Sequence, residues 1–270
     1  MATYVIGDVQ GCHFSFLNLL KEISFKFNKD KLIFVGDLVN RGRHSLEFLN
    51  WCYENQSNIN FVLGNHDLHL MAIYFGQGDL RPDDTLDGIL ESTNIKKYIN
   101  WLLEGNLSLD VKDFFIVHAG LYPKWGTREA HGYGLDVMKS IRKNPNRFFE
   151  EMYGNNPVLW SENLNPIDHQ RFVVNSMTRM RFLRHDLSLD LEYKGSSISD
   201  NNLDSKAWFL FERKRQKKKI ISGHWSAIGL KEHVYGISID TGCVWGNKLT
   251  AFNLENNKIY QVNAASKDLI

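Results

Sequence analysis

The segment from Gly36 to Leu68 decides the fold, because it contains the peptides Gly36-Asp-Leu-Val-Asn-Arg-Gly42 and Gly64-Asn-His-Asp-Leu68. Each peptide follows a short apolar run, residues 32–35 and 60–63, with the composition of a buried strand. A third peptide, Gly7-Asp-Val-Gln-Gly11, follows the apolar residues 4–6 in the same way. The three glycine-led peptides are about thirty residues apart, a spacing that suits one βαβ unit each.

Polar side chains therefore stand where the predicted strands end. In an α/β sheet this is the edge where ligands bind, because loops converge there above rigid strands. Two further strand-like runs, residues 114–117 and 219–223, lead to histidines. We expect the polar residues of the glycine-led peptides, Asp8, Asp37 and Asn65, to lie together at this edge. His118 and His224 should lie beside them.

Such a cluster needs a cation. Close carboxylates repel each other and raise the pKa of one of them, and a divalent ion removes this repulsion. Oxygen and imidazole ligands without thiolates suit Mn²⁺, Mg²⁺, Fe²⁺ or Zn²⁺. Five strand ends carry candidate ligands, too many for one tetrahedral ion. This favours two ions that share a carboxylate, an arrangement used in phosphoryl transfer.

Together with His118-Ala-Gly120 and Gly223-His224, these motifs resemble the calcineurin-like, PPP-type metallophosphoesterases. Within that superfamily, residues 1–12, 61–70, 178–182 and 238–246 resemble the symmetrical bis(5′-nucleosyl)-tetraphosphatases, or diadenosine tetraphosphate hydrolases. The resemblance spans nearly the whole chain. It implies hydrolysis of diadenosine tetraphosphate to two ADP by a hydroxide that two divalent ions activate. The alternatives are a protein serine/threonine phosphatase with the same site and a non-enzymatic binding module with the same fold.

The expected architecture is α/β, with two packed mixed β-sheets flanked by helices, the dinuclear metallophosphoesterase fold. The two-sheet detail is what the resemblance implies. We expect one domain spanning residues 1–270, in which residues 122–202 could form a helical insertion over the site. Apolar periodicity predicts helices after Gly11 and at residues 45–53, 67–75 and 96–103. Alternating segments at 234–239, 249–254 and 258–262 predict a second sheet in the last part of the chain.

The resemblance also implies roles for the ligands. Asp37 would bridge the two ions, Asp8 would complete the first site, and the second site would be completed by Asn65, His118 and His224. Gln10 stands where the wider family has a histidine. Because a glutamine carbonyl is a weaker donor than imidazole, we expect the first ion to be held less tightly and to favour Mn²⁺, with Co²⁺, Mg²⁺ and Fe²⁺ as alternatives. Gln10 could also bind only through water, or not at all.

His66 follows a ligand directly and is the candidate general acid for the leaving phosphate oxygen. Asn40 stands where the family has an aspartate that assists this histidine. An amide can orient the ring but cannot stabilise its cation by charge, so we expect a less basic His66. Arg41 fits a phosphate bidentately. Arg179 and Arg181 are further candidates, because a substrate with four phosphates needs more than one cation. On a strand, residues at i and i+2 face the same way, and which of the two arginines matters stays open.

The composition favours no partner other than the substrate, a dinucleoside polyphosphate. A net charge of +1 over 270 residues gives no overall attraction to nucleic acid or membrane. The run Arg213–Lys219 lacks aromatic residues, so we expect a solvated basic face and no specific nucleic-acid binding. We see no targeting segment or membrane span. Three cysteines without a CxxC pair (Cys12, Cys52 and Cys243) suit the reducing cytoplasm. The oligomeric state stays open.

Overall fold

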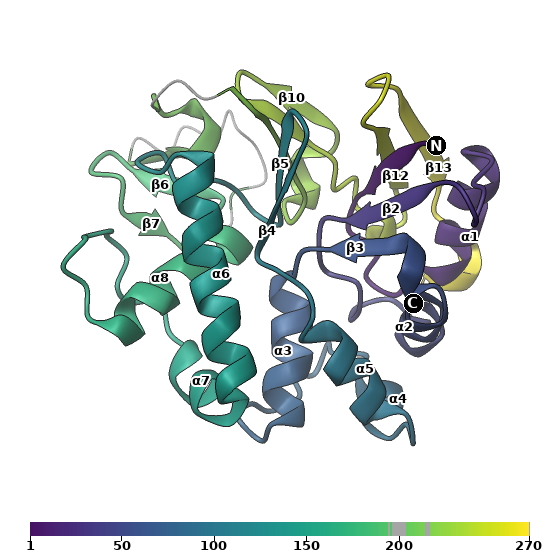
Figure 1. The fold of residues 1–270 in the computed structure, drawn as a ribbon, viewed down its shortest axis with the longest axis horizontal. Helices are drawn as coiled ribbons and strands as arrows, with labels where there is room; N and C mark the ends of the chain where they lie inside the picture. Colours follow the sequence, from purple (N-terminus) through teal and green to yellow (C-terminus); the bar gives the residue numbers. More distant parts are fainter. Residues whose placement is uncertain (194, 196–203, 214–216, 270) are drawn as a thin grey trace.

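The computed structural model describes residues 1–193, 195, 204–213 and 217–269. Within these residues, the strands form two five-stranded sheets and one three-stranded sheet, with helices packed around them (Figure 1). This arrangement confirms the predicted α/β fold with two mixed sheets. No helix in the described residues is both long and apolar enough to span a membrane.

The first sheet carries the three glycine-led peptides. Its strand order is β13-β12-β1-β2-β3, and its strands are β1 (Thr3–Ile6), β2 (Lys31–Phe34), β3 (Ile59–Phe61), β12 (Lys248–Asn253) and β13 (Ile259–Asn263). β1, β2 and β3 are parallel neighbours. The peptides that follow them therefore emerge at one edge, as predicted.

Two crossover helices, α1 (His13–Glu22) and α2 (Ser45–Glu54), connect these parallel strands. Each helix buries one apolar face against the sheet. Phe16 of α1, Phe48 of α2 and Phe34 of β2 are fully buried, with ring centroids 5.1 to 5.7 Å apart. Buried aromatic contacts of this kind contribute strongly to a core, so they fix the helices and the loops that precede them.

The second sheet brings the two histidines to the same region. Its order is β10-β11-β9-β5-β4, and its strands are β4 (Ser108–Val111), β5 (Phe114–Val117), β9 (Lys219–Ser222), β10 (Lys231–His233) and β11 (Gly236–Ser238). β5, β9 and β11 are parallel. The two main sheets pack through a separate apolar cluster that includes Val5, Ile33, Ile116, Ile221 and Ile237.

The remaining helices lie around the two main sheets. α3 (Asn65–Tyr74), α4 (Asp87–Leu90) and α5 (Ile95–Leu102) follow β3. Between β5 and β9 come α6 (Thr127–Lys143), α7 (Pro145–Met152), α8 (Pro166–Arg179) and the small sheet β7-β6-β8, with β6 (Phe182–Arg184), β7 (Leu189–Asp190) and β8 (Ser205–Ala207). Figure 1 shows α6 and α8 on the side of the molecule opposite α1 and α2.

The segment 122–202 is thus helical up to Arg179 and then adds short strands. Its description as an insertion within one domain stays a prediction, and residues 194 and 196–202 lie outside the described residues. In the basic run, residues 214–216 also lie outside them. Arg213 departs from the expected solvated face, because its guanidinium stacks over the rings of Tyr235 and Trp208.

Two expectations for the last part of the chain are wrong. Its strands do not form one sheet, because β9 pairs with β5 in the second sheet whereas β12 pairs antiparallel with β1 in the first. Residues 234–239 are not one strand, because Val234 and Tyr235 form the turn between β10 and β11. β10 is a charged edge strand, which apolar alternation could not reveal.

Candidate metal centre and active site

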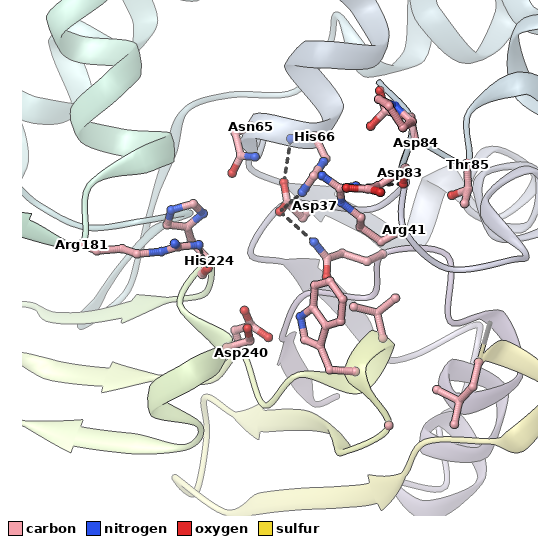
Figure 2. A pocket seen from close by; sticks show the side chains of 17 residues that line it. Asp37, Arg41, Asn65, His66, Asp83, Asp84, Thr85, Arg181, His224 and Asp240 are labelled. Atoms are coloured by element: carbon pink, nitrogen blue, oxygen red, sulfur yellow. Dashed lines mark hydrogen bonds and ion pairs between the residues drawn. The ribbon is translucent and has the colours of Figure 1, made fainter. Parts of the chain in front are cut away.

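A cavity of about 950 Å³ lies at the edge where both main sheets end. The residues that line it include Gln10, Asp37, Arg41, Asn65, His66, Arg181, His224 and Asp240. Figure 2 shows Asp37 between His66 and Arg41 on one side and His224 with Arg181 on the other. Asp8, Asn40 and His118 are buried in the same region. The fold therefore brings the predicted residues together, with Arg179 in adjoining cavities that it shares with Asn65 and His224.

The backbone at this site is strained. Gln10, Asp37, Asn40, Arg41 and His224 all have positive φ angles, between 46° and 80°. Residues other than glycine rarely adopt this region, and such strain persists where the surrounding structure imposes it, often at functional sites. The strain lies in the loops that leave the parallel strands, where the chain turns to direct its side chains into the cavity.

Asp37 is at the centre of the cluster. Its Oδ1 accepts a hydrogen bond from the His66 backbone N–H at 2.9 Å and lies 3.4 Å from Nε2 of His118. Its Oδ2 accepts a hydrogen bond from Nε2 of Gln10 at 3.3 Å. Burial alone would raise the pKa of Asp37, but the imidazoles of His118 and His66 lower it overall. The Asp37 carboxylate is thus held ionised.

Each of the two histidines has one ring nitrogen placed against a backbone carbonyl. Nδ1 of His118 lies 2.8 Å from the Val35 oxygen, and Nε2 of His224 lies 3.2 Å from the Arg179 oxygen. When these nitrogens donate their N–H to the carbonyls, the other ring nitrogen of each histidine keeps a lone pair that can bind a metal ion. One candidate ligand atom each from Asp37, His118 and His224 lies within 4.8 Å of the other two. Histidines that bind metals are typically fixed in this way.

The carboxylates around this group need a cation. Burial raises the pKa of Asp8, and the nearby Asp240 and Asp37 carboxylates raise it further. Burial also raises the pKa of Asp240, to about 6, and Asp37 contributes to that rise. Asp8 accepts hydrogen bonds from the His224 backbone N–H at 3.0 and 3.2 Å. Oxygen and imidazole ligands packed this closely fit divalent metal ions.

Asp240 is a residue of the site that the sequence analysis missed. It lies two residues after β11 ends at Ser238, so it follows a strand as Asp37 does, and this position could have identified it. Its Oδ1 accepts a hydrogen bond from the Gly242 N–H at 3.0 Å.

Two glycines allow the carboxylates to approach. A Cβ on Gly64 would lie 2.0 Å from Oδ1 of Asp37, and a Cβ on Gly223 would lie 1.9 Å from Oδ1 of Asp8. Both contacts are far shorter than any real Cβ tolerates. The glycines of the Gly64-Asn65 and Gly223-His224 motifs therefore have a steric function.

Gly64→Ala should accordingly weaken metal binding while the protein stays folded. Displacing Asp37 should lower metal affinity by roughly 10- to 100-fold or more, the cost typical of losing a group that supports a metal ligand. The control is Gly88→Ala in α4, where nothing lies within 4 Å of the new Cβ. Titration calorimetry with Mn²⁺ measures the effect, and circular dichroism checks the fold. Equal affinities for the two variants would contradict the steric explanation.

α3 begins at Asn65, two residues before the predicted start. Asp67 is the third residue of a capping box, and its Oδ2 accepts a hydrogen bond from the Gly64 N–H at 2.9 Å. Its Oδ1 accepts another from Leu38 N–H at 2.9 Å, which ties α3 to the loop after β2. His66 therefore lies in the first turn of a helix.

Asn40 connects His66 to Asp84. The Oδ1 of Asn40 accepts hydrogen bonds from the backbone N–H groups of Arg41 and Thr85, at 2.8 and 3.0 Å. Its Nδ2 therefore points the other way and donates to Oδ1 of Asp84 at 2.8 Å and to Nδ1 of His66 at 3.0 Å. Because Nδ1 accepts, the proton of neutral His66 lies on Nε2. Burial lowers the pKa of His66.

Asp84 should stabilise the fold in a pH-dependent way. Its side chain is 1% exposed. Burial would raise its pKa, but hydrogen bonds from Asn40, Arg81 and His69 lower it from 3.8 to about 2. A depressed pKa contributes stability above the unfolded-state value, and that contribution is lost as the pH falls through the folded-state value.

Asp84→Asn should therefore lower the free energy of unfolding by about 2 kcal/mol at pH 7. Between pH 4 and pH 2 the difference from wild type should shrink, because wild-type Asp84 becomes protonated. Urea unfolding at several pH values measures this difference. A difference that is constant across this range would exclude the ionised Asp84 as its source.

The arginines are only partly where the sequence predicted them. Arg41 lines the cavity and donates from Nη1 to the Asp83 carbonyl oxygen at 2.8 Å. Arg181 lines it too, and burial lowers its pKa. Arg179 and Arg181 do not share a strand face, because Arg179 is the last residue of α8 and β6 begins at Phe182. Arg179 lines a neighbouring cavity of about 260 Å³, which shares Asn65 and His66 with the large one.

Gln10 reaches the cluster through its amide nitrogen, which donates to Asp37. In this orientation it positions the carboxylate, and its carbonyl would become a ligand after rotation of the amide. Gln10 as a metal ligand stays a prediction.

The comparisons with known proteins agree with this geometry. A family profile described as calcineurin-like phosphoesterase matches residues 1–227. The symmetrical bis(5′-nucleosyl)-tetraphosphatase of Methylobacillus flagellatus is 41% identical over 264 residues, 97% of this chain and 95% of that protein. Proteins of the same name from Chromobacterium violaceum and Neisseria meningitidis are each 40% identical, over 97% and 98% of this chain and 95% and 96% of their own lengths.

The solved structure of a candidate diadenosine tetraphosphatase superposes with a TM-score of 0.67 at 20% identity, covering 98% of this chain and 94% of that one. At this identity the likeness concerns the fold alone. The profile and the sequence relatives place the chain itself: it belongs to the calcineurin-like phosphoesterases and, within them, to the symmetrical bis(5′-nucleosyl)-tetraphosphatases.

Proposed function

We propose that this chain is a hydrolase that cuts diadenosine tetraphosphate symmetrically into two ADP. The relatives that carry this name match it over almost their full lengths. The observation that carries the proposal is the position of the cluster between two cavities. Asn65 and His66 line both the 950 Å³ cavity and the 260 Å³ cavity. A substrate with two equivalent halves can extend into both, so that its central phosphates lie at the cluster.

The proposed cofactor is a pair of divalent ions, with Mn²⁺ favoured. Asp8, Asp37 and Gln10 would hold the first ion, and Asp37, Asn65, His118 and His224 the second. When bound, such ions stabilise charge on phosphoryl oxygens and lower the pKa of attacking water. The buried free cysteines of the described chain suit the reducing cytoplasm, the compartment we propose.

Arginines and a helix end would neutralise the phosphates. Arg41 and Arg181 line the large cavity and Arg179 the small one, so both halves of the substrate meet a cation. Guanidinium groups bind phosphate oxygens bidentately. α3 begins at Asn65, and the positive end of its dipole adds to the attraction.

His66 would donate a hydrogen bond from its Nε2–H to the leaving oxygen. Because Asn40 donates to Nδ1, the ring is held as a neutral donor at Nε2. The leaving group is the terminal phosphate of ADP, and a phosphate with a second pKa of about 6 departs near neutral pH without taking a proton. A hydrogen bond from His66 therefore suffices for this reaction.

The protein serine/threonine phosphatase is less well supported. A departing serine alkoxide requires a full proton, which an imidazolium supplies best when a carboxylate stabilises it. Here the group at Nδ1 is the Asn40 amide. A protein that only binds nucleotides would not need the Nε2–H donor of His66, which Asn40 holds in place.

Product analysis tests the proposal. The purified protein is incubated with Mn²⁺ and diadenosine tetraphosphate, with a phosphoserine peptide in parallel, and the nucleotides are separated by ion exchange. ADP should be the sole nucleotide product. AMP with ATP would refute symmetrical cleavage, and release of phosphate from the peptide alone would favour the phosphatase.

A further inference from the structure

Trp245 is an exposed aromatic residue in the wall of the catalytic cavity. It is 63% exposed, whereas the tryptophans at positions 101, 125, 160, 208 and 225 are buried. An indole offers a large apolar surface whose burial is favourable. A ring left this open in a cavity is therefore available to a ligand.

The backbone that carries Trp245 forms a hydrogen-bonded turn. The residue ends a short 3₁₀ helix, Cys243–Trp245, between Gly242 and Gly246, which have φ angles of 68° and 85°. The Trp245 N–H donates to the Gly242 oxygen at 3.0 Å, and Cys243 is 1% exposed. The same turn is tied to the metal cluster, because the Gly242 N–H donates to Asp240. The Cα of Trp245 is thus held at a fixed position relative to the cluster.

The cavity is lined by two chemically different kinds of side chain. Its lining includes predicted metal ligands and the cations Arg41 and Arg181, and it also includes the apolar side chains of Trp245, its chain neighbour Val244 and Leu269. A nucleotide has the same division, with anionic phosphates at one end and an aromatic base at the other. A cavity of 950 Å³ is within the range that holds such ligands.

We propose that Trp245 is a stacking platform for one base of the dinucleoside polyphosphate. This proposal rests on the proposed function and assigns a base subsite to it. Stacking on an aromatic ring is tolerant of base identity, because every base has a π face. The platform should therefore accept adenine and guanine similarly, and bis-guanosine tetraphosphate should be cleaved with a KM within about threefold of that for diadenosine tetraphosphate.

Steady-state kinetics of Trp245→Ala and Trp245→Phe test the platform, with Val234→Ala as the matched control. Val234 is 81% exposed and does not line the cavity. Trp245→Ala should raise KM for diadenosine tetraphosphate about tenfold with little change in kcat, and Trp245→Phe should stay within about threefold of wild type. KM for inorganic tetraphosphate, which has no base, should change by less than about threefold. An unchanged KM for the dinucleotide, or an equal rise for both substrates, would overturn the proposal.

A binding measurement separates this proposal from the proposed function. ADP added in Mg²⁺ buffer should quench the tryptophan fluorescence of the wild-type protein, inorganic pyrophosphate should not, and the ADP effect should be lost in Trp245→Phe. If the protein fails to cleave diadenosine tetraphosphate but shows this pattern, the substrate assignment fails and the base platform stands. Quenching by ADP that persists in Trp245→Phe would refute the platform even if cleavage is symmetrical.

Discussion

Replacing Asp37 with asparagine should abolish both metal loading and turnover. Asp37 contacts His66, His118 and Gln10 within 3.4 Å, and its ionised form is stabilised by the neighbouring imidazoles. The asparagine amide has nearly the same shape but no charge. Its N–H group would face the N–H donors of His66 and Gln10 that now bond to the carboxylate. Because the cluster acts as a unit, we expect kcat for diadenosine tetraphosphate to fall by roughly 10³-fold or more.

The control for Asp37→Asn is Asp136→Asn, which makes the same chemical change at an exposed position on α6. Metal content per chain, measured by atomic absorption after gel filtration, should fall in the first variant and not in the second. An Asp37→Asn protein that keeps its metal and its turnover would show that this carboxylate is not a ligand.

Replacing His66 should have the second largest effect on kcat. The choice of substituent distinguishes a hydrogen-bond donor from a residue that transfers a proton. His66→Ala should lower kcat by about 10²- to 10³-fold, the cost of removing one positioned donor, with KM nearly unchanged. His66→Gln can place an amide N–H near the position of Nε2. If His66 acts as a hydrogen-bond donor, as the Asn40 contact indicates, His66→Gln should recover about tenfold of the lost rate.

The matched control for these variants is His44→Ala, because His44 lies outside the cavity and bonds to the Lys267 carbonyl. Equal losses in His66→Ala and His66→Gln would mean that His66 transfers a proton, since glutamine cannot. No loss in either variant would remove His66 from the reaction.

The cluster of candidate metal ligands was predictable because its residues follow strands. Asp8, Asp37, Asn65, His118 and His224 each come directly after an apolar run, or after its terminal glycine, and parallel strands bring their carboxyl ends to one edge. Local sequence and a general rule of sheet topology were therefore enough to place them together. The boundaries of α3 were less predictable, since they depend on the contact between Asp67 and the Gly64 N–H.

Features that depend on contacts distant in sequence were not predictable. The link from Asn40 to Asp84 spans 44 residues and arises only when the loop after α3 folds back onto the loop after β2. Arg179 and Arg181 were misplaced because the strand propensity of their peptide does not reveal that α8 continues to Arg179. β12 joins the first sheet rather than the second because it pairs with β1, almost the full length of the chain away.

The most direct test of the central claim is hydrolysis of diadenosine tetraphosphate in ¹⁸O-labelled water, followed by mass spectrometry of the products. Direct attack of water on a central phosphorus predicts ADP as the sole nucleotide, with one ¹⁸O on the terminal phosphate of one of the two ADP molecules. Label in AMP would place the attack at an outer phosphorus, and label in ATP would show that AMP rather than ADP is the leaving group. Either result would contradict a centre that lies between two equivalent halves of the substrate.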